Sequence, residues 1–361
     1  MNHKDTPKDI PNGILDGQMV KLDASTRENL YDTSYYGRPM DGSLDLTLIE
    51  AAYLVYKDRI TVSHEGRKLD FEGLVCESSR REGNFEVKYI VFKDLRERGY
   101  FIKPGVTDFR VYPRGGKPGK TPSRYFVHVL TERQPIPLMD LVHQVQTAAN
   151  VRKDLVIAVV DEESDITYYE VKLTSMKGDM GKAAEDAGIR ATLLEDRVIV
   201  WDALSSELLH TQHLYGKPLD ESRLQLSLIE AVYLQEKNII LIEDSRVERT
   251  LTQTEFSETS AAVETEFPMK MAVYRHLRDA GMVVKTGYKF GTHFRVYKKV
   301  DPSVGMRHSE FLVHAVDGGH VFNLLHLSRA VRLANSVRKQ MVFAWQTGDD
   351  ILYLELGRMK M

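Results

Sequence analysis

Cysteine is almost missing from this sequence, since Cys76 is the only one among 361 residues. A single thiol excludes an internal disulfide and a cysteine-ligated zinc cluster, and it favours a reducing cytosol as the working environment. Long apolar runs are missing as well. No stretch approaches the ~20 residues that an apolar helix needs to cross a membrane. We therefore expect a cytoplasmic protein that has no membrane partner.

An excess of positive charge is also lacking. Lys and Arg number 49 against 52 Asp and Glu, which gives a net charge of −3. Any contact with nucleic acid must therefore come from a local basic patch rather than from the charge of the whole chain. The sequence contains no phosphate-binding P-loop, no Gly-rich dinucleotide fingerprint and no HExxH zinc motif.

What the sequence does contain is an internal repeat. Five segments of the first half recur in the same order in the second half, at offsets of 179 to 186 residues. The pairs are YGRP and YGKP, LTLIEAAYL and LSLIEAVYL, DFRVY and HFRVY, YFVHV and FLVHA, and VRK at 151–153 and 337–339. A period this long is not that of a solenoid, and it indicates two homologous domain pairs in tandem.

Each copy is expected to have two domains. Short apolar strands and an apolar-periodic helix indicate a small N-terminal α/β domain, and a glycine at 99 or 281 ends the helix that leads into the second domain. The second domain alternates β-rich segments with one helix, about 138–151 or 324–337. Segment 247–267 has no pattern that assigns it to an element. The predicted boundaries are a flexible tail 1–14, domains 15–98 and 99–172, a linker 173–190, and domains 191–280 and 281–361.

The end of the second copy carries an ordered set of chemically useful residues. It reads RVY, then HSEFLVH, then RLANSVRK, and so presents Tyr297, His308, Arg332 and Lys339. Taken singly, such a tyrosine is usually part of a core, and such a lysine usually complements a helix dipole. Their occurrence together and in order is what points to a catalytic centre.

With its surrounding text, this set resembles the archaeal tRNA-splicing endonuclease family, in the homodimeric form that has two fused repeats. The resemblance covers nearly the whole chain. It implies an α/β (α+β) fold of two tandem repeats, each a small N-terminal α/β domain followed by a restriction-endonuclease-like nuclease domain. It also implies that precursor tRNA is cut at a bulge–helix–bulge element, with no metal ion or other cofactor. The implied partners are this RNA and a second copy of the chain.

The resemblance also implies a role for each catalytic residue. Tyr297 is the general base that takes the proton of the RNA 2′-hydroxyl, His308 the general acid that protonates the 5′-oxygen, and Lys339 the cation that stabilises the transition-state charge. An imidazole ordinarily titrates near neutrality, which suits an acid. A phenol has an ordinary pKa of ~10, so Tyr297 needs nearby cations to act as a base. Lys298 and Lys299, together with Lys339, are candidates for the cations that would lower the pKa of Tyr297.

Three arginines are candidates for binding RNA. Arg332 resembles the family's arginine that clamps a bulged base, since a guanidinium plane stacks on bases and pairs with phosphates. Arg358 is the candidate for a second clamp near the C-terminus, and a solvated terminal charge is an equal alternative. Arg295, on the strand that ends in RVY, contacts phosphate or faces solvent.

The first copy retains only part of this set. Tyr112 and Lys153 are kept, but the position of the acid is taken by Pro122, or by Ser123 if the insertion falls later. Gln146 stands at the position of the clamp arginine. We therefore predict that the first repeat is a scaffold without activity.

An acidic turn distinguishes the first copy from the second. Asp161, Glu162, Glu163 and Asp165 crowd four carboxylates into five residues, whereas the second copy has only Gly-Asp-Asp at 348–350. Such a turn is either simply solvated or faces cations. The family resemblance implies that it docks into a basic pocket on the active repeat of the partner copy.

Two other functions remain open from sequence alone. A metal-dependent nuclease is suggested weakly by Glu170 and Lys172 in an E-x-K string, with Asp161 upstream. A non-catalytic RNA-binding subunit is the other alternative. His128 and His314 lie inside apolar strands, and we expect them to be structural.

Overall fold

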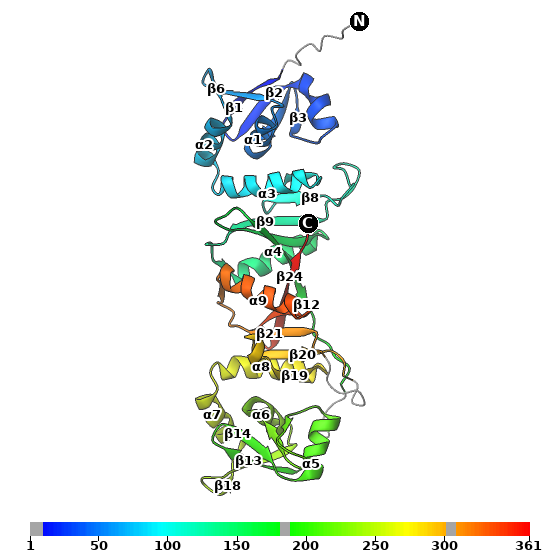
Figure 1. Cartoon of the computed structure of the whole chain (residues 1–361), viewed down its shortest axis with the longest axis vertical. Helices are drawn as coiled ribbons and strands as arrows, with labels where there is room; N and C mark the ends of the chain where they lie inside the picture. Colours follow the sequence, from blue (N-terminus) through cyan, green and yellow to red (C-terminus); the bar gives the residue numbers. More distant parts are fainter. Residues whose placement is uncertain (1–9, 181–187, 301–307) are drawn as a thin grey trace. The chain divides into compact units, whose positions relative to one another are not determined.

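The structure is a computed structural model that describes residues 10–180, 188–300 and 308–361. Its contacts divide the chain into two compact units, and each unit contains one copy of the repeat. The first unit comprises the chain up to Pro135 with His143–Val171 and Arg358–Met361, and the second comprises Ile136–Val142 and Lys172–Gly357. The elements of both units are labelled in Figure 1.

The N-terminal domain of the first unit is a six-stranded sheet in the order β3-β4-β2-β1-β5-β6, with two helices. Its strands and helices are β1 (Asn12–Asp16), β2 (Met19–Asp23), β3 (Arg38–Met40), β4 (Ser43–Thr47), β5 (Thr61–His64), β6 (Arg67–Leu69), α1 (Leu48–Tyr56) and α2 (Phe71–Arg81), with short helical turns η1 (Ala24–Thr26) and η2 (Glu28–Asp32). Helix α1 is buried on most of its surface, which explains why its sequence is apolar nearly all round.

The second unit begins with the same arrangement, in the order β15-β16-β14-β13-β17-β18. Its elements are β13 (Ile189–Leu194), β14 (Arg197–Val200), α5 (Ala203–Glu207), η3 (Leu208–Gln212), β15 (Lys217–Pro218), β16 (Leu224–Leu226), α6 (Leu228–Glu236), β17 (Ile240–Asp244), β18 (Arg249–Thr250) and α7 (Gln253–Val263). Helix α6 occupies the place of α1. Both helices begin at a capping box, Thr47 with Glu50 and Ser227 with Glu230, which ties down the first exposed amide groups of each helix.

The C-terminal domain of each unit is built on a five-stranded part of a mixed sheet. In the first unit the order is β12-β11-β9-β8-β7, and in the second it is β19-β20-β21-β23-β24. The elements of the first copy are α3 (Phe85–Glu97), β7 (Ile102–Pro104), β8 (Phe109–Val111), β9 (Tyr125–Thr131), β10 (Ile136–Pro137), α4 (Leu138–Asn150), β11 (Asp154–Val160) and β12 (Ile166–Thr174). Of these, β10 and the first five residues of α4 are grouped with the second unit. The elements of the second are α8 (Phe267–Asp279), β19 (Val283–Thr286), η4 (Tyr288–Phe290), β20 (Phe294–Tyr297), β21 (Phe311–Ala315), β22 (Val321–Phe322), α9 (Leu324–Ser336), β23 (Gln340–Thr347) and β24 (Asp350–Met359).

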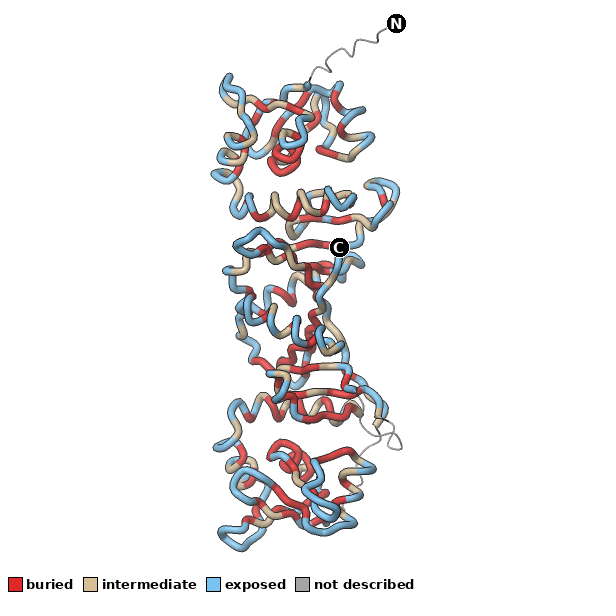
Figure 2. The backbone as a smooth tube through the Cα atoms, in the orientation of Figure 1, coloured by how far each residue is buried: buried red, intermediate tan, exposed pale blue. Residues whose placement is uncertain are grey.

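Alternation along the strands explains why helices cover both faces of this sheet. In the second unit, Val296, Val313 and Val342 point into a core that also contains Tyr274 of α8. Residues between them alternate to the opposite face of the sheet, and α8 and α9 both contact β23. Figure 2 shows the result, with buried backbone along the strands and exposed backbone in the turns.

Strand register aligns the two copies residue by residue. Val111 pairs with Tyr125, and Tyr125 pairs with Asp154, while in the second copy Val296 pairs with Phe311 and Phe311 with Gln340. The three strands of one copy therefore superpose in register on those of the other. Every later comparison between the copies uses this alignment.

A buried ion pair joins the two domains inside each unit. Lys285 Nζ of β19 lies 3.2 Å from Glu230 Oε1 of α6 and donates a hydrogen bond of 2.8 Å to the carbonyl of Gly216. Glu230 also accepts hydrogen bonds from the amides of Gly216 and Ser227. In the first unit the equivalent ion pair joins Lys103 Nζ and Glu50 Oε1, which are 3.7 Å apart. We call this pair of charged residues between the two domains of a unit the latch.

The structure differs from the sequence expectations at three places. Helix α7 fills most of segment 247–267, for which no element was expected. Strand β1 begins at Asn12, inside the predicted tail, because Gly13 and Leu15 are buried in alternation; residues 1–9 lie outside the described residues. Strand β12 runs to Thr174, two residues into the predicted linker. Among the described residues, no helix is long and apolar enough to cross a membrane.

Candidate active site

Tyr297 is the last residue of β20, and it is buried, with 3% of its surface exposed. Its ring packs against Val283, its partner on β19, and against Leu214. Because Tyr297 is the last residue of its strand, the core holds its ring at the end of the sheet rather than in the middle.

Lys339 stands where helix α9 turns into strand β23. The preceding residue, Arg338, has a left-handed φ of 57°, and the Lys339 amide donates to the carbonyl of Ala334 at 2.8 Å. The side chain then reaches back across the sheet, and Nζ donates a hydrogen bond of 2.7 Å to the carbonyl of Ser309. The ammonium is thus fixed beside the backbone that carries His308.

Register brings the predicted catalytic residues together. The Glu310 amide donates to the carbonyl of Val296 at 3.1 Å, and the Gln340 amide donates to the carbonyl of Glu310 at 2.9 Å. Tyr297 follows Val296 in the chain, and Lys339 precedes Gln340. The two residues therefore lie on either side of Glu310, at the ends of the two strands that flank β21. Since strands lie ~4.8 Å apart, the backbone positions of Tyr297 and Lys339 are separated by roughly 10 Å.

His308 lies two residues before Glu310 and is exposed. It is the first described residue after the segment 301–307, which lies outside the described residues. Because Lys339 is bonded to the carbonyl of Ser309, the backbone of His308 lies one residue from the atom that holds the ammonium. An exposed imidazole here is accessible to a ligand.

The electrostatics of Tyr297 differ from the sequence expectation. Burial raises the pKa of the phenol above its ordinary value of 10.0, and the Glu310 carboxylate raises it further. The opposing cation is Arg295, which does not reverse the shift. Lys298, Lys299 and Lys339, the cations expected from the sequence, are not among the causes.

The pKa of Lys339 is shifted downward. Burial is the main cause, and the positive charges of Arg295 and Lys289 act in the same direction, against Glu310. Arg295, Lys339 and Glu310 therefore share one electrostatic environment around Tyr297. The Nε atom of Arg295 is buried, and none of the described residues accepts a hydrogen bond from it. A guanidinium in this state is suited to an anionic ligand.

The other two arginines are placed differently. Arg332 is exposed on α9, on the helix that leads into Lys339. Arg358 is exposed on β24, one residue beyond the part of that strand that belongs to the second unit.

Two contributors to this cluster were not predicted from the sequence. Glu310 lies between the tyrosine and lysine strands, and its carboxylate accepts from the Lys298 amide at 3.0 Å. Phe290, in the turn η4, places its ring 5.8 Å from Lys339 Nζ and 5.1 Å from Lys289 Nζ. Strand pairing could have indicated Glu310, whereas no sequence signal indicated the contact of Phe290.

The first copy keeps the backbone arrangement of this site although it lacks the histidine. The register places Pro122 at the position of the acid, which decides between the two alternatives left by the sequence, and it places Lys153 at the position of the active lysine. Arg152 repeats the left-handed φ of 57°, and the Lys153 amide donates to Ala148 at 2.9 Å. Gln146 is exposed on α4. The scaffold of the site is therefore conserved between the copies, although its proton donor is not.

The acidic turn between β11 and β12 is exposed along its whole length. The Asp161 carboxylate accepts hydrogen bonds from the amides of Glu163 and Asp165, at 3.0 and 2.9 Å, and so closes the turn on itself. Glu162 forms an ion pair with Arg133 at 2.6 Å, between side chains that are both mostly exposed. The remaining carboxylates are presented to solvent.

The residues of the E-x-K string are not gathered into one site. Glu170 pairs with Val156 of β11, and Asp161 lies five residues after Val156, just past the end of that strand, at a distance of roughly 17 Å. Lys172 forms an ion pair with Glu355 at 3.0 Å. In the part of the chain that the structure describes, no cluster of three His, Cys, Asp or Glu side chains could hold a metal ion.

The strand histidines make contacts that suit a structural role. His128 Nδ1 lies 2.8 Å from Asp108 Oδ2. At the equivalent positions of the second copy, His314 stacks on His293 with ring centroids 4.0 Å apart. The amide of Ala315 donates to His293 Nδ1, and burial, aided by His314, lowers the pKa of His293 to about 3.

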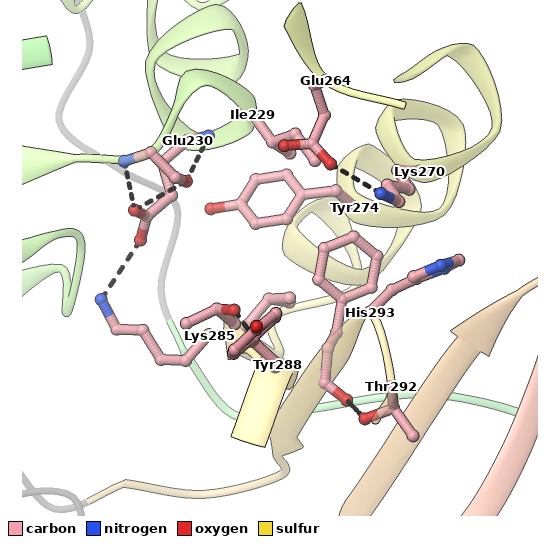
Figure 3. Close-up of a pocket in the computed structure, with 13 residues that line it drawn as sticks. Ile229, Glu230, Glu264, Lys270, Tyr274, Lys285, Tyr288, Thr292 and His293 are labelled. Atoms are coloured by element: carbon pink, nitrogen blue, oxygen red, sulfur yellow. Dashed lines mark hydrogen bonds and ion pairs between the residues drawn. The ribbon is translucent and has the colours of Figure 1, made fainter. Parts of the chain in front are cut away.

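A pocket of about 240 Å³ lies in the second unit between the N-terminal and C-terminal domains. Figure 3 shows it with the Glu230–Lys285 pair at one side, the Tyr274 ring in the middle and His293 at the other side. Neither Tyr297 nor the other predicted catalytic residues line it. The strand-end cluster, rather than this pocket, is therefore the candidate active site.

Comparison with known proteins gives the same division of the chain. The family model described as tRNA intron endonuclease, N-terminal domain, matches residues 12–75 and 189–256, and the model described as tRNA intron endonuclease, catalytic C-terminal domain, matches residues 85–168 and 267–353. The prediction of two tandem repeats, each with an N-terminal and a C-terminal domain, is confirmed.

Whole proteins from archaea are similar over nearly their full length. A tRNA-splicing endonuclease from Methanococcoides burtonii is 49% identical over 343 residues, which cover 95% of this chain and 97% of that protein. One from Methanosarcina acetivorans is also 49% identical, over 96% of this chain and 99% of that protein. One from Haloferax volcanii is 37% identical, again over 96% and 99% of the two chains.

Proposed function

Because this chain belongs to the tRNA intron endonuclease family, we propose that it is a tRNA-splicing endonuclease that acts in the cytoplasm and cuts precursor tRNA at both intron boundaries. The cuts fall in a bulge–helix–bulge element and require no metal ion. The observation that supports this proposal is that Tyr297 ends β20 and Lys339 precedes β23, the two strands that flank β21, and that His308 lies three residues before β21.

The reaction is a transesterification inside the RNA. Tyr297, as the phenolate, takes the proton from the 2′-hydroxyl next to the scissile phosphate, and that oxygen bonds to phosphorus. The bond from phosphorus to the 5′-oxygen breaks, and His308 gives its proton to the departing oxygen. The products are a 2′,3′-cyclic phosphate and a 5′-hydroxyl.

Two cations stabilise the charge that develops on the phosphate oxygens. Lys339 is held by the Ser309 carbonyl with two N–H donors remaining, and Arg295 has an unpartnered Nε nearby. The raised pKa of Tyr297 means that the phenolate is a minor species at neutral pH. The rate of the step is therefore limited by the ionised fraction of this tyrosine.

Recognition of RNA relies on the shape of the unpaired nucleotides rather than on long base sequences. Arg332 projects from α9 into solvent, and it clamps a bulged base by stacking. Arg358 is the second clamp.

Two catalytic repeats are needed for two cuts, and a homodimer supplies them. The acidic turn Asp161–Asp165 of the first repeat docks against a basic surface on the active repeat of the partner copy. The closed backbone of the turn supports this role, because it presents the carboxylates of Glu163 and Asp165, which pair with no cation among the described residues, as a preformed anionic tip. The second copy, with Gly348-Asp349-Asp350, has no comparable tip.

The proposal is tested by incubating the full chain with a bulge–helix–bulge precursor RNA in excess EDTA, followed by analysis of the new RNA ends. The expected result is cutting at both boundaries with 2′,3′-cyclic phosphate and 5′-hydroxyl ends. Loss of activity in EDTA that Mg²⁺ restores, or 5′-phosphate ends, would point to a metal-dependent nuclease instead.

Matched variants separate the two repeats. His308→Ala should abolish cutting, while Tyr112→Phe in the first repeat should leave the rate near that of the unmodified chain. Equal losses in the two variants would contradict the assignment of catalysis to the second repeat. Binding of the RNA by His308→Ala without cutting would show that the loss is chemical.

A further inference from the structure

The first repeat has a hollow where the second repeat has its active lysine. It measures about 510 Å³, and its lining includes Val106, Arg110, Ser123, Phe126, Val151 and Lys153. By strand register Lys153 and Ser123 are the counterparts of Lys339 and Ser309. The hollow is thus the equivalent of the proposed active site in the copy that has lost its acid.

A shorter turn explains why the hollow is open. Four residues, 105–108, join β7 to β8, whereas seven residues, 287–293, join β19 to β20. The longer turn carries Phe290, whose ring lies 5.8 Å from the ammonium of Lys339. The shorter turn, Gly-Val-Thr-Asp, has no aromatic side chain, and Val106 is 76% exposed at the rim.

The connection from β8 to β9, which supplies Ser123 to the lining of the hollow, is strongly basic. The segment 113–124, which connects β8 to β9, contains Arg114, Lys117, Lys120 and Arg124 and no acidic residue, and all four cations are exposed. The nearest carboxylate of the next strand, Asp154, pairs with Arg124 at 3.6 Å. This connection therefore concentrates cations in a chain whose net charge is −3.

The two cations that line the hollow are available to a ligand. Arg110 is anchored by one hydrogen bond, from Nε to the carbonyl of Pro104 at 3.0 Å, and no described residue accepts from its terminal nitrogens. Lys153 is half-buried, and no described carboxylate pairs with its ammonium. Val151, at the other wall, is 51% exposed.

We propose that this hollow is a second, non-catalytic RNA site that binds one nucleotide of the precursor outside the cleaved bond. Lys153 and Arg110 hold its phosphate, and Val106 and Val151 contact the base. Pro122 has no proton to give, so the bound phosphodiester is not cut. The inference rests on the proposed function, because it takes its ligand from the RNA that the second repeat cleaves.

The charge of the hollow selects this occupant. Arginine and lysine beside an apolar wall match a phosphate joined to a base, and salt-dependent phosphate contacts supply most of the affinity for RNA. A hollow of this size lies within the usual range for small-ligand sites. Binding here would lengthen the RNA contact without adding a cut.

The test compares Lys153→Ala, Arg110→Ala and the double variant with a matched control, Lys68→Ala. Lys68 is an exposed lysine on β6 of the same unit, so its substitution removes the same charge. The probe is a precursor RNA with 2′-deoxynucleotides at both cleaved positions, which prevents the reaction. Affinity is measured by fluorescence anisotropy between 50 and 300 mM salt.

Each single variant should bind roughly fivefold more weakly at ~0.1 M salt, with the salt slope reduced by about 0.7, the value for one phosphate contact to a single strand. With cleavable RNA, kcat/KM should fall in parallel, while kcat at saturating RNA is retained. Lys339→Ala should give the opposite pattern, a loss in kcat.

Two outcomes would overturn the inference. One is that the double variant binds RNA with the same affinity and salt slope as Lys68→Ala. The other is that affinity falls together with the mass of the assembly in light scattering, which would make the hollow a contact between copies. Failure of the unmodified chain to cut the RNA would instead refute the proposed function. Circular dichroism of each variant checks that it is folded.

Discussion

The buried latch between the domains of the second unit allows a quantitative prediction for Lys285→Met. The substitution keeps the length of the side chain but removes the charge opposite Glu230, whose carboxylate is 3.2 Å away and buried. It also removes the hydrogen bond to the carbonyl of Gly216. Breaking one side of a buried pair is expected to be far more destabilising than losing an exposed ion pair.

The magnitude follows from what Glu230 can do without its partner. A carboxyl with an ordinary pKa of 4.5 that is kept protonated at pH 7 costs about 3.4 kcal/mol, at about 1.36 kcal/mol for each pH unit. The lost hydrogen bond adds about 1 kcal/mol. The expected loss of unfolding free energy is therefore about 4 kcal/mol at pH 7.

The same reasoning fixes the pH dependence. Burial alone would raise the pKa of the Glu230 carboxyl, but Lys285 and the amide donors hold this pKa below 4.5. The stability that the ionised carboxylate contributes is therefore present above pH 4.5 and is lost as the pH falls through the lowered pKa. In Lys285→Met the pKa of Glu230 is raised, and the free energy needed to protonate this carboxyl becomes small at acidic pH. At pH 5 the cost should shrink to about 2 kcal/mol.

Urea unfolding followed by tryptophan fluorescence measures this effect directly. The two tryptophans of the chain, Trp201 and Trp345, both belong to the second unit. Lys103→Met is the matched control, since it breaks the equivalent latch in the first unit and should leave the fluorescence transition in place. A loss below about 1 kcal/mol at pH 7, or a loss that does not change with pH, would refute the reasoning.

Three further predictions concern catalysis and assembly. The first uses an RNA substrate with a 5′-thio leaving group, which needs no acid to depart. Because the pKa of Tyr297 is raised, the cutting rate should rise about tenfold per pH unit up to pH 9, and a plateau near neutrality would exclude Tyr297 as the base. His308→Ala should cut this substrate as fast as the unmodified chain. Arg332→Ala should raise KM by one to two orders of magnitude, because stacking worth about 1–3 kcal/mol is lost. Gln146→Ala, at the equivalent position of the first repeat, should leave KM unchanged. Equal effects of the two substitutions would contradict the assignment of a base clamp to α9. Reversing the charges of Asp161–Asp165 to lysine should lower both the mass in light scattering and the cutting rate, whereas unchanged values would mean that the turn is only solvated.

The sequence allowed much of the candidate site to be predicted, because its residues stand at the edges of strands. Tyr297 ends an apolar β-rich run, and Lys339 follows a helix and precedes another such run, so the approximate positions followed from periodicity. The repeat then indicated which residues were missing from the first copy. What the sequence left undecided, Pro122 or Ser123, required the pairing of β8, β9 and β11.

Other features depend on contacts that no local pattern records. Glu230 and Lys285 are 55 residues apart in the chain and meet only when two domains pack. Arg295 rather than a lysine is the main cation beside Tyr297, because alternation on β20 places both side chains on one face. Helix α7 buries little apolar surface, so periodicity did not show it, although the capping box of Thr252 and Glu255 marks its start in the sequence.

The alignment of Pro122 with the acid position has a genetic consequence. Proline codons ending in a pyrimidine become histidine codons by a single change in the middle base. Where the Pro122 codon ends in a pyrimidine, one nucleotide separates a repeat that has an imidazole at this position from one that does not, and Tyr112 and Lys153 are unaffected by the change.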